Sequence, residues 1–351
     1  MSRPFWQRPA VRAALVVAAA GLVAVTFRNA DLARIRQLLT AAPALVLVPI
    51  AFLVAMSFDT LGWRRLLAAP ATVGFVPLLG TRLSTEAVGM SLPSGAVVAE
   101  AVSLHLLGTR CGVSTAPAVA SLAARRFYVF LSLGLVMATA AGVGYTTLRS
   151  ISPGVIGHPG LQWLALAAAA VLLTLAFVLR AALLGGGLAQ GLNRLLSRLP
   201  VPPLRAWLAR SLDTFQAADR GMGAALAKPG RHPALTVSLF VMVWLTESCE
   251  TFVILTLLGA GLTFRQVFSF DSPLTFLRAL AFFVPAGLGV QDLGYLAFLK
   301  GLGVHEAVNV GAAFVLVKRS KEICWIVIGY LLLALHAWKN PNGSSPAAKP
   351  A

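Results

Sequence analysis

Long apolar stretches separated by short polar segments dominate the chain. Six of these stretches are long enough to cross a bilayer as a helix, which takes about 20 residues. They lie at residues 9–27, 43–63, 116–147, 161–185, 233–258 and 305–338. This pattern predicts an all-α polytopic membrane protein with six spanning helices.

Two further apolar stretches, at about 74–108 and 266–300, are interrupted in the middle by proline and glycine. Each half is too short to cross alone, and lipid offers no hydrogen-bond partners to a broken backbone. We therefore expect two re-entrant helical hairpins that are buried against protein.

Composition agrees with this interpretation. Only 12% of the 351 residues are charged and the mean hydropathy is +0.81, whereas soluble domains are about 25% charged. The net charge of +17 could suggest nucleic acid, but the Lys and Arg residues gather between apolar stretches. There they orient a membrane protein and contact anionic headgroups. We expect lipids rather than nucleic acid as partners, one membrane domain at 1–338, and a disordered cytoplasmic tail at 339–351.

The loop at about 186–232 is rich in arginine, which predicts a cytoplasmic location. Its leucine periodicity indicates an amphipathic helix on the inner membrane surface, for simple anchoring or for a partner. Counting spans outward predicts a multi-pass protein of the cytoplasmic (inner) membrane with both termini in the cytoplasm. Residues 149–160 are then external, and so is the segment 28–42 despite its three arginines.

The N-terminal region combines basic residues with an apolar run at 13–25, so a cleaved signal peptide and a first span are both considered. No small-x-small cleavage site precedes Arg28, which favours the span. Cys111, Cys249 and Cys324 form no CxxC motif and have no histidine nearby. They are interpreted as small core residues, and neither a metal site nor a cofactor is expected.

An internal repeat is visible in the chain. Pro93, Gly95 and Glu100 have the spacing Pro-x-Gly-x4-acid, and the same spacing recurs 192 residues later. The matching features are Pro285, Gly287 and Asp292 for this motif, Glu250 for Asp59, and Lys318 and Arg319 for Arg125 and Arg126. Three spans separate the hairpins, and this odd number inverts the second half, about 161–338, relative to the first, about 9–148.

Nine of the 12 acidic residues lie in or beside apolar segments. A charge at bilayer depth costs several kcal/mol, so these side chains require a cavity or a partner. Buried ion pairs with a structural role are one interpretation, and Pro-x-Gly alone could serve only close packing. The favoured hypothesis is one polar cavity for a charged headgroup. Its predicted residues are Asp59, Arg82, Pro93, Gly95, Glu100, Arg125, Arg126, Glu250, Arg278, Pro285, Gly287, Asp292, Lys318 and Arg319.

At these motifs the chain resembles the lysylphosphatidylglycerol synthase transmembrane regions, also called flippase-like membrane proteins. The resemblance rests on Leu92-Pro-Ser-Gly95 with Glu100, on Phe283-Val-Pro-Ala-Gly-Leu-Gly-Val-Gln-Asp292, and on Leu316-Val-Lys-Arg-Ser-Lys-Glu322. The second motif is most similar to the branch associated with hopanoid biosynthesis, although the family commonly has Glu where Asp292 stands. The resemblance covers about residues 10–338.

The resemblance implies a flippase or transporter that moves an anionic phospholipid, an isoprenoid or a hopanoid lipid between leaflets. The soluble aminoacyl-transferring domain of the synthases does not follow the last span, so we expect no lysylphosphatidylglycerol synthesis and no enzyme. Without a GxxxxGK[ST] motif, transport would be downhill or ion-coupled. An intramembrane enzyme acting on a polyprenyl phosphate is the alternative, with candidate groups Ser84, Thr85, Ser91, Ser94 and His105. An accessory scaffold of a lipid-synthesis complex is the third hypothesis.

Overall fold

The computed structural model describes residues 21, 29–67, 72–92, 95–185, 232–280 and 287–339. Every regular element in these ranges is a helix, so the predicted all-α polytopic fold is confirmed. The predicted first span at 9–27 lies outside the described residues except for residue 21. The arginine-rich loop, apart from His232, and the tail beyond Lys339 also lie outside them.

Five helices in the described part of the chain are long and apolar enough to cross a membrane. They confirm five of the six predicted spans. They are η2 with α3 (Pro43–Leu47 and Val48–Leu66), α6 (Thr115–Val143), α8 (Leu161–Gly185), α12 (Pro233–Leu257) and α15 (Ala307–Lys339).

The two stretches interrupted by proline and glycine are pairs of shorter helices. The first pair is α4 (Phe75–Ser91) and α5 (Gly95–Cys111), and the second is α13 (Phe264–Leu280) and α14 (Val290–Gly301). The longest of them has 17 residues, or roughly 26 Å at about 1.5 Å per residue, against a hydrocarbon core of about 30 Å. Two broken helical hairpins are therefore present where the pattern predicts them.

Two short helices, one beside α15 and one beside α8 and α14, complete the described elements. In α2 (Leu32–Ala41) the Asp31 carboxylate caps the first turn, accepting the Ala33 N–H at 2.9 Å. The other, α7 (Tyr145–Ile156), occupies most of the segment expected as a loop at 149–160. That prediction was wrong because the chain only bends at Gly144 between α6 and α7 and then stays helical as far as Gly157, whose φ is +79°.

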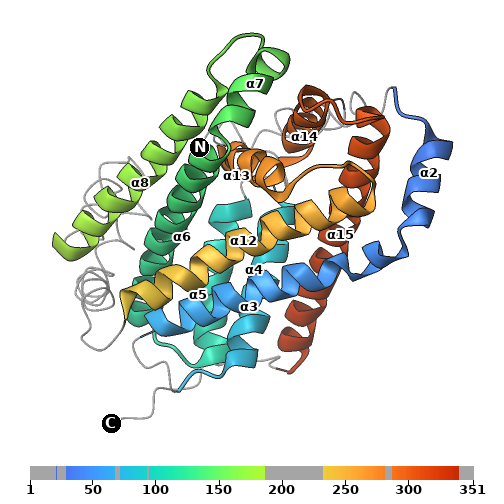
Figure 1. Ribbon diagram of the computed structural model, residues 1–351. Coiled ribbons are helices and arrows are strands. Elements are labelled where there is room, and N and C mark those ends of the chain that lie inside the picture. The colour runs from blue at the N-terminus through green and yellow to red at the C-terminus, as the bar shows by residue number, and fades with distance from the viewer. Residues whose placement is uncertain are drawn as a thin grey trace, which may run out of the picture.

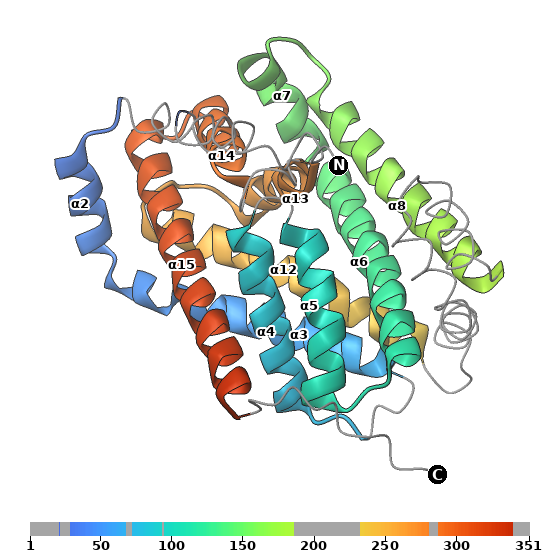
Figure 2. The same ribbon diagram turned by 180° about the vertical axis from the view of Figure 1, so that it is seen from behind.

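The helices of the two halves pack in the same order, but the halves run in opposite directions. In the first half α3, α4, α5 and α6 pack on one another in turn, and α12, α13, α14 and α15 do the same in the second. Between halves, α3 packs along α12, while α4 lies on α15 and α13 on α6. Figures 1 and 2 show α3 beside α12 in the middle of the molecule. This is the arrangement of an inverted repeat.

Polar contacts group the helix ends that the span count places on the same side. At one end, Arg34 of α2 forms an ion pair with Glu306, which precedes α15, at 2.8 Å. At the other end, Arg110 of α5 donates to the Leu332 carbonyl of α15 at 2.9 Å. These two contacts agree with the sides that the span count assigns to these segments, and the orientation in the membrane stays a prediction.

Large apolar side chains lie both in the core and on the outer surface of the helices. Buried aromatic rings join α13, α14 and α15, with Phe270 and Phe298 stacked at 5.1 Å between centroids. Large apolar side chains such as Phe177 of α8 are exposed, as expected of a surface that lipid covers. Cys111 is half-buried and packs against a core cluster, but Cys249 and Cys324 are exposed, so the interpretation of these last two as core residues was wrong. These thiols are on membrane helices, where an outward-facing apolar surface needs no protein partner.

Candidate functional site

A central cavity of about 450 Å³ lies between the two halves. Side chains from both hairpins and from α3, α6, α12 and α15 line it. Seven of them are acidic and seven are basic, so their formal charges balance: Asp59, Glu86, Glu100, Glu247, Asp271, Asp292 and Glu322, with Arg82, Arg125, Arg126, Arg278, Lys318, Arg319 and Lys321. The cavity is thus a polar compartment inside an apolar helical protein.

The first cluster of charges centres on Asp59 of α3. Arg125 donates to both carboxylate oxygens, from Nε to Oδ1 at 2.9 Å and from Nη2 to Oδ2 at 2.6 Å. Arg82 of α4 also donates to Oδ2 at 2.6 Å and extends to Glu86 with its other end. The Asp59 side chain is only 4% exposed, so two guanidinium groups replace the water that would otherwise solvate it.

The second cluster repeats this arrangement around Glu250 of α12. Lys321 lies 2.6 Å and Lys318 lies 3.3 Å from the same carboxylate oxygen. Lys318 and Glu250 are the repeat equivalents of Arg125 and Asp59. The internal repeat is therefore a repeat of contacts as well as of sequence.

A third pair of equivalents lies at the hairpins. Arg126 of α6 forms an ion pair with Glu100 of α5. In the other half, Arg319 of α15 donates to Asp292 of α14 at 2.6 Å. Asp292 also accepts the backbone N–H of Gly289 at 2.9 Å and so caps the start of α14.

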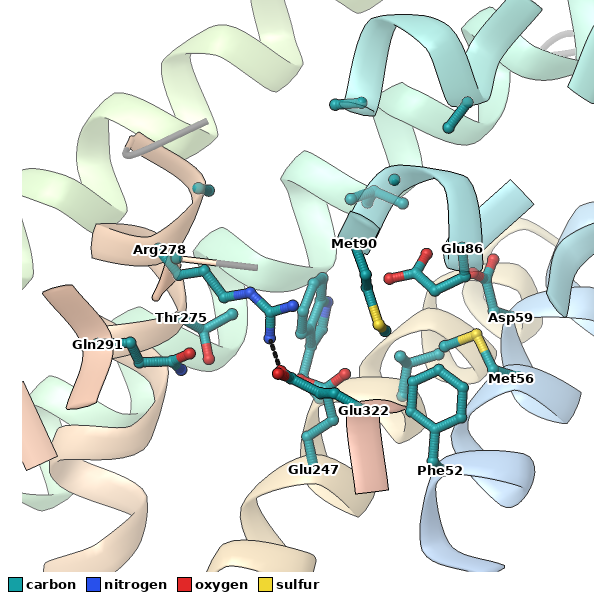
Figure 3. A pocket seen from close by; sticks show the side chains of 18 of the residues that line it. Phe52, Met56, Asp59, Glu86, Met90, Glu247, Thr275, Arg278, Gln291 and Glu322 are labelled. Atoms are coloured by element: carbon teal, nitrogen blue, oxygen red, sulfur yellow. Dashed lines mark ion pairs between the residues drawn. The ribbon is translucent and has the colours of Figure 1, made fainter. Parts of the chain in front are cut away.

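These two equivalent pairs differ in exposure. The side chains of Arg126 and Glu100 are 38% and 32% exposed, whereas those of Arg319 and Asp292 are 16% and 4% exposed. Arg319 also bonds to Glu322 at 2.6 Å, and Glu322 lies 3.3 Å from Arg278. Figure 3 shows this last pair directed into the cavity.

Most residues predicted for the site lie around this one cavity. Ten of them line it: Asp59, Arg82, Glu100, Arg125, Arg126, Arg278, Gly287, Asp292, Lys318 and Arg319. Glu250 lies behind the lining, in contact with it through Lys318 and Lys321. Pro93 and Pro285 lie outside the described residues.

The two predicted glycines serve the packing of the hairpins. A Cβ on Gly95 would lie 2.8 Å from the Val88 carbonyl oxygen, so α5 needs this glycine to approach α4. Gly287 has a φ of +64°, and its Cβ would lie 2.7 Å from the Arg278 side chain. Of the two, Gly95 does not line the cavity, which gives it a structural role rather than a place in the site.

Several lining residues were not among the predicted site residues. Asp271 accepts hydrogen bonds from the hydroxyl groups of Ser248, Thr251 and Tyr295 at 2.7–2.8 Å. Glu247 points into the cavity (Figure 3). The spacing held a signal, because Glu247 precedes Glu250 by three residues, and positions three apart share one face of a helix.

The nucleophile candidates of the enzyme hypothesis do not gather at the basic groups. Of those in the described residues, Thr85 alone lines the cavity, and His105 is exposed on α5. Glu306, counted among the acids beside apolar segments, lies away from the cavity and pairs with Arg34.

Comparison with models of protein families matches residues 11–318 to the lysylphosphatidylglycerol synthase TM region. The match covers most of the chain, including both hairpins and the basic pair Arg125–Arg126, and it ends at Lys318. Searches of curated proteins and of solved structures gave no significant match.

Proposed function

We propose that this chain, which belongs to the lysylphosphatidylglycerol synthase TM region family, moves an anionic lipid between leaflets. The observation that carries the proposal is the charge-balanced cavity between two inverted halves. Inverted-repeat transporters hold their substrates near the membrane midplane at the same kind of interface. The family match itself supports a lipid-related membrane protein.

The cavity addresses the main energetic obstacle to lipid movement. A headgroup charge that enters hydrocarbon loses its hydration, which costs several kcal/mol. Guanidinium and ammonium groups offer hydrogen bonds in place of water, and arginine matches phosphate through two parallel N–H donors. A phosphate at Arg126 or Arg319 would be solvated by protein while the acyl chains stay in lipid.

Binding would proceed by exchange of one anion for another. Arg126 and Arg319 both bond to carboxylates before any lipid is present. A phosphate that takes the place of Glu100 or Asp292 leaves each guanidinium paired, so neither cation is left buried without a counter-charge. The proposed substrate is therefore a lipid with an anionic phosphate group, and isoprenoid or hopanoid lipids qualify where they carry one.

Reconstituted vesicles test the proposal. Fluorescent phosphatidylglycerol in the inner leaflet should become accessible to an external quencher faster in vesicles that contain the protein. Arg126→Ala and Arg319→Ala should each abolish the acceleration, whereas Arg149→Ala on α7, outside the cavity, should retain it. Equal activity in all variants would overturn the proposal.

The same preparation addresses the enzyme alternative. Release of inorganic phosphate from a polyprenyl phosphate by the purified protein would replace transport with catalysis as its function. We expect no release above the rate without protein, because among the described candidates only Thr85 faces the cavity.

A further inference from the structure

A second hollow, of about 380 Å³, lies between α5 and α6. It is called the α5–α6 groove here, and its lining consists of Ala101, Leu104, Val119, Leu122 and Ala123, with Glu100 and Arg126 at one end. The last two residues also line the central cavity. One ion pair therefore separates an apolar groove from a polar compartment.

The position of the groove on the protein points to lipid. Val97 and Val98, on the same helix α5, are 72% and 42% exposed, so this side of the helix presents apolar surface outward. The Glu100 carboxylate and the Arg126 guanidinium at the end of the groove are partly exposed. The equivalent pair between α14 and α15, Asp292 and Arg319, is largely buried. Within the described residues, the ion pair between α5 and α6 is therefore the more exposed of the two equivalent pairs that line the cavity.

We propose that the α5–α6 groove binds an acyl chain of an anionic phospholipid while the phosphate of that lipid pairs with Arg126 in place of Glu100. The proposal deepens the proposed transport function and rests on it. Apolar side chains line the groove and match a hydrocarbon chain, and the cation at its end matches the phosphate. The lipid would thus reach the cavity sideways from the leaflet that surrounds α5 and the first turns of α6.

The geometry requires only one bond to change. Glu100 forms its ion pair with Arg126 and is partly exposed, so its carboxylate can turn to water when phosphate arrives. Moving Asp292 away from Arg319 would cost more free energy, because Asp292 also caps α14 by accepting the N–H of Gly289. The first contact of the lipid is therefore expected at Arg126 and not at Arg319.

Photolabelling measures binding without relying on transport. The full chain is reconstituted with phosphatidylglycerol that carries a diazirine in one acyl chain, irradiated, and analysed by mass spectrometry of its peptides. Labels should concentrate on Leu104, Val119, Leu122 and Ala123. Diacylglycerol with the same diazirine chain but without phosphate should label these positions at least several-fold less.

Variants separate the groove from ordinary lipid contact. Ala123→Trp should fill the groove and reduce its labelling about tenfold, whereas Val171→Trp, on the exposed side of α8, should leave it unchanged. Arg126→Gln should reduce labelling by phosphatidylglycerol to the diacylglycerol level, and Arg126→Lys should retain most of it. The lysine variant keeps the test valid if the tryptophan variant fails to fold.

The outcomes distinguish this inference from the transport function. Labels spread evenly over α6 and α8, or equal labelling with and without phosphate, would overturn the α5–α6 groove as a binding site even if transport is observed. If labels concentrate in the groove but the protein moves no lipid, the binding site is supported and the transport function is refuted.

Discussion

Arg125 donates to both oxygens of the Asp59 carboxylate, at 2.9 and 2.6 Å, and thereby ties α6 to α3. The equivalent residues of the second half, Lys318 and Glu250, lie 3.3 Å apart and tie α15 to α12. Each half of the protein is thus held by an acid on the span that precedes its hairpin and a base on the span that follows it. Because these charges are buried, removing one of them should lower the stability of the protein more than removing a charge from an exposed ion pair.

Replacing Asp59 by Asn should lower the free energy of unfolding by about 3–5 kcal/mol, the usual cost of leaving a buried charge without its partner. Arg82 and Arg125 would both lose their shared carboxylate. Reversible unfolding in mixed micelles measures the loss. Glu306→Gln, at an ion pair open to water, should cost far less, and an equal loss in both variants would contradict the central role of Asp59.

Gly329→Ala should destabilise the contact between α15 and α4. The added Cβ would lie 2.8 Å from the Leu83 carbonyl oxygen, and such overpacking typically costs about 1–3 kcal/mol. Gly142→Ala in α6 is the matched control, since nothing lies within 4 Å of its Cβ and alanine favours helix over glycine by about 1 kcal/mol. The midpoint temperature of thermal unfolding should fall for Gly329→Ala and should stay unchanged or rise for Gly142→Ala.

The contact between α2 and the start of α15 should weaken in acid. The hydrogen bond from Arg34 and its charge lower the pKa of Glu306 below the ordinary value of about 4.3. Because the folded state then binds the proton more weakly than the unfolded state, the pair stabilises the contact above the unfolded pKa and is lost as the pH falls through the folded pKa. Protection of the α2 amides against hydrogen exchange, taken relative to the intrinsic rate at each pH, should fall below about pH 4.

The control for this pH effect is Glu306→Gln, which carries no titrating carboxylate. In that variant, exchange in α2 should already be fast at neutral pH and should show no such acid step. The wild-type protein in high salt should approach the variant, because salt screens exposed pairs. An unchanged acid step in Glu306→Gln would assign the effect to another group.

Orientation is testable by labelling single cysteines in a background without Cys111, Cys249 and Cys324. The span count predicts that a cysteine at position 158, after α7, reacts with an impermeant reagent from outside the cell. One at position 339, at the end of α15, should react only after the membrane is permeabilised. Reaction of both from one side would refute the predicted topology.

The sequence pattern was sufficient for the five described spans, the two hairpins and the repeat. Apolar length locates the spans, and Pro-x-Gly with a following acid locates the hairpins, because both are local properties of the chain. The repeat placed Asp59 and Arg125, 66 residues apart, in one predicted cavity, since each residue has its equivalent near the same offset, but their direct pairing came only from the structure.

Other features depend on packing and left little local signal. Lys321 contacts Glu250 across 71 residues, yet it has no charged equivalent in the first half, where Tyr128 stands. Asp271 is stabilised by hydroxyl groups from two other helices, which only the folded arrangement brings together. Helix α7 was missed because its residues have too few apolar positions to resemble a span.

Exchanging the conformations of the two halves would bury the Arg126–Glu100 pair and expose the Arg319–Asp292 pair. Both forms would contain the same kinds of helix contacts, because the halves pack in the same order, so their free energies should be similar. Since the halves are inverted, the opening beside α14 and α15 would face the opposite leaflet. If the protein moves lipid as proposed, a pseudo-symmetric fold with unequal halves would supply the two states of an alternating-access cycle from a single set of contacts.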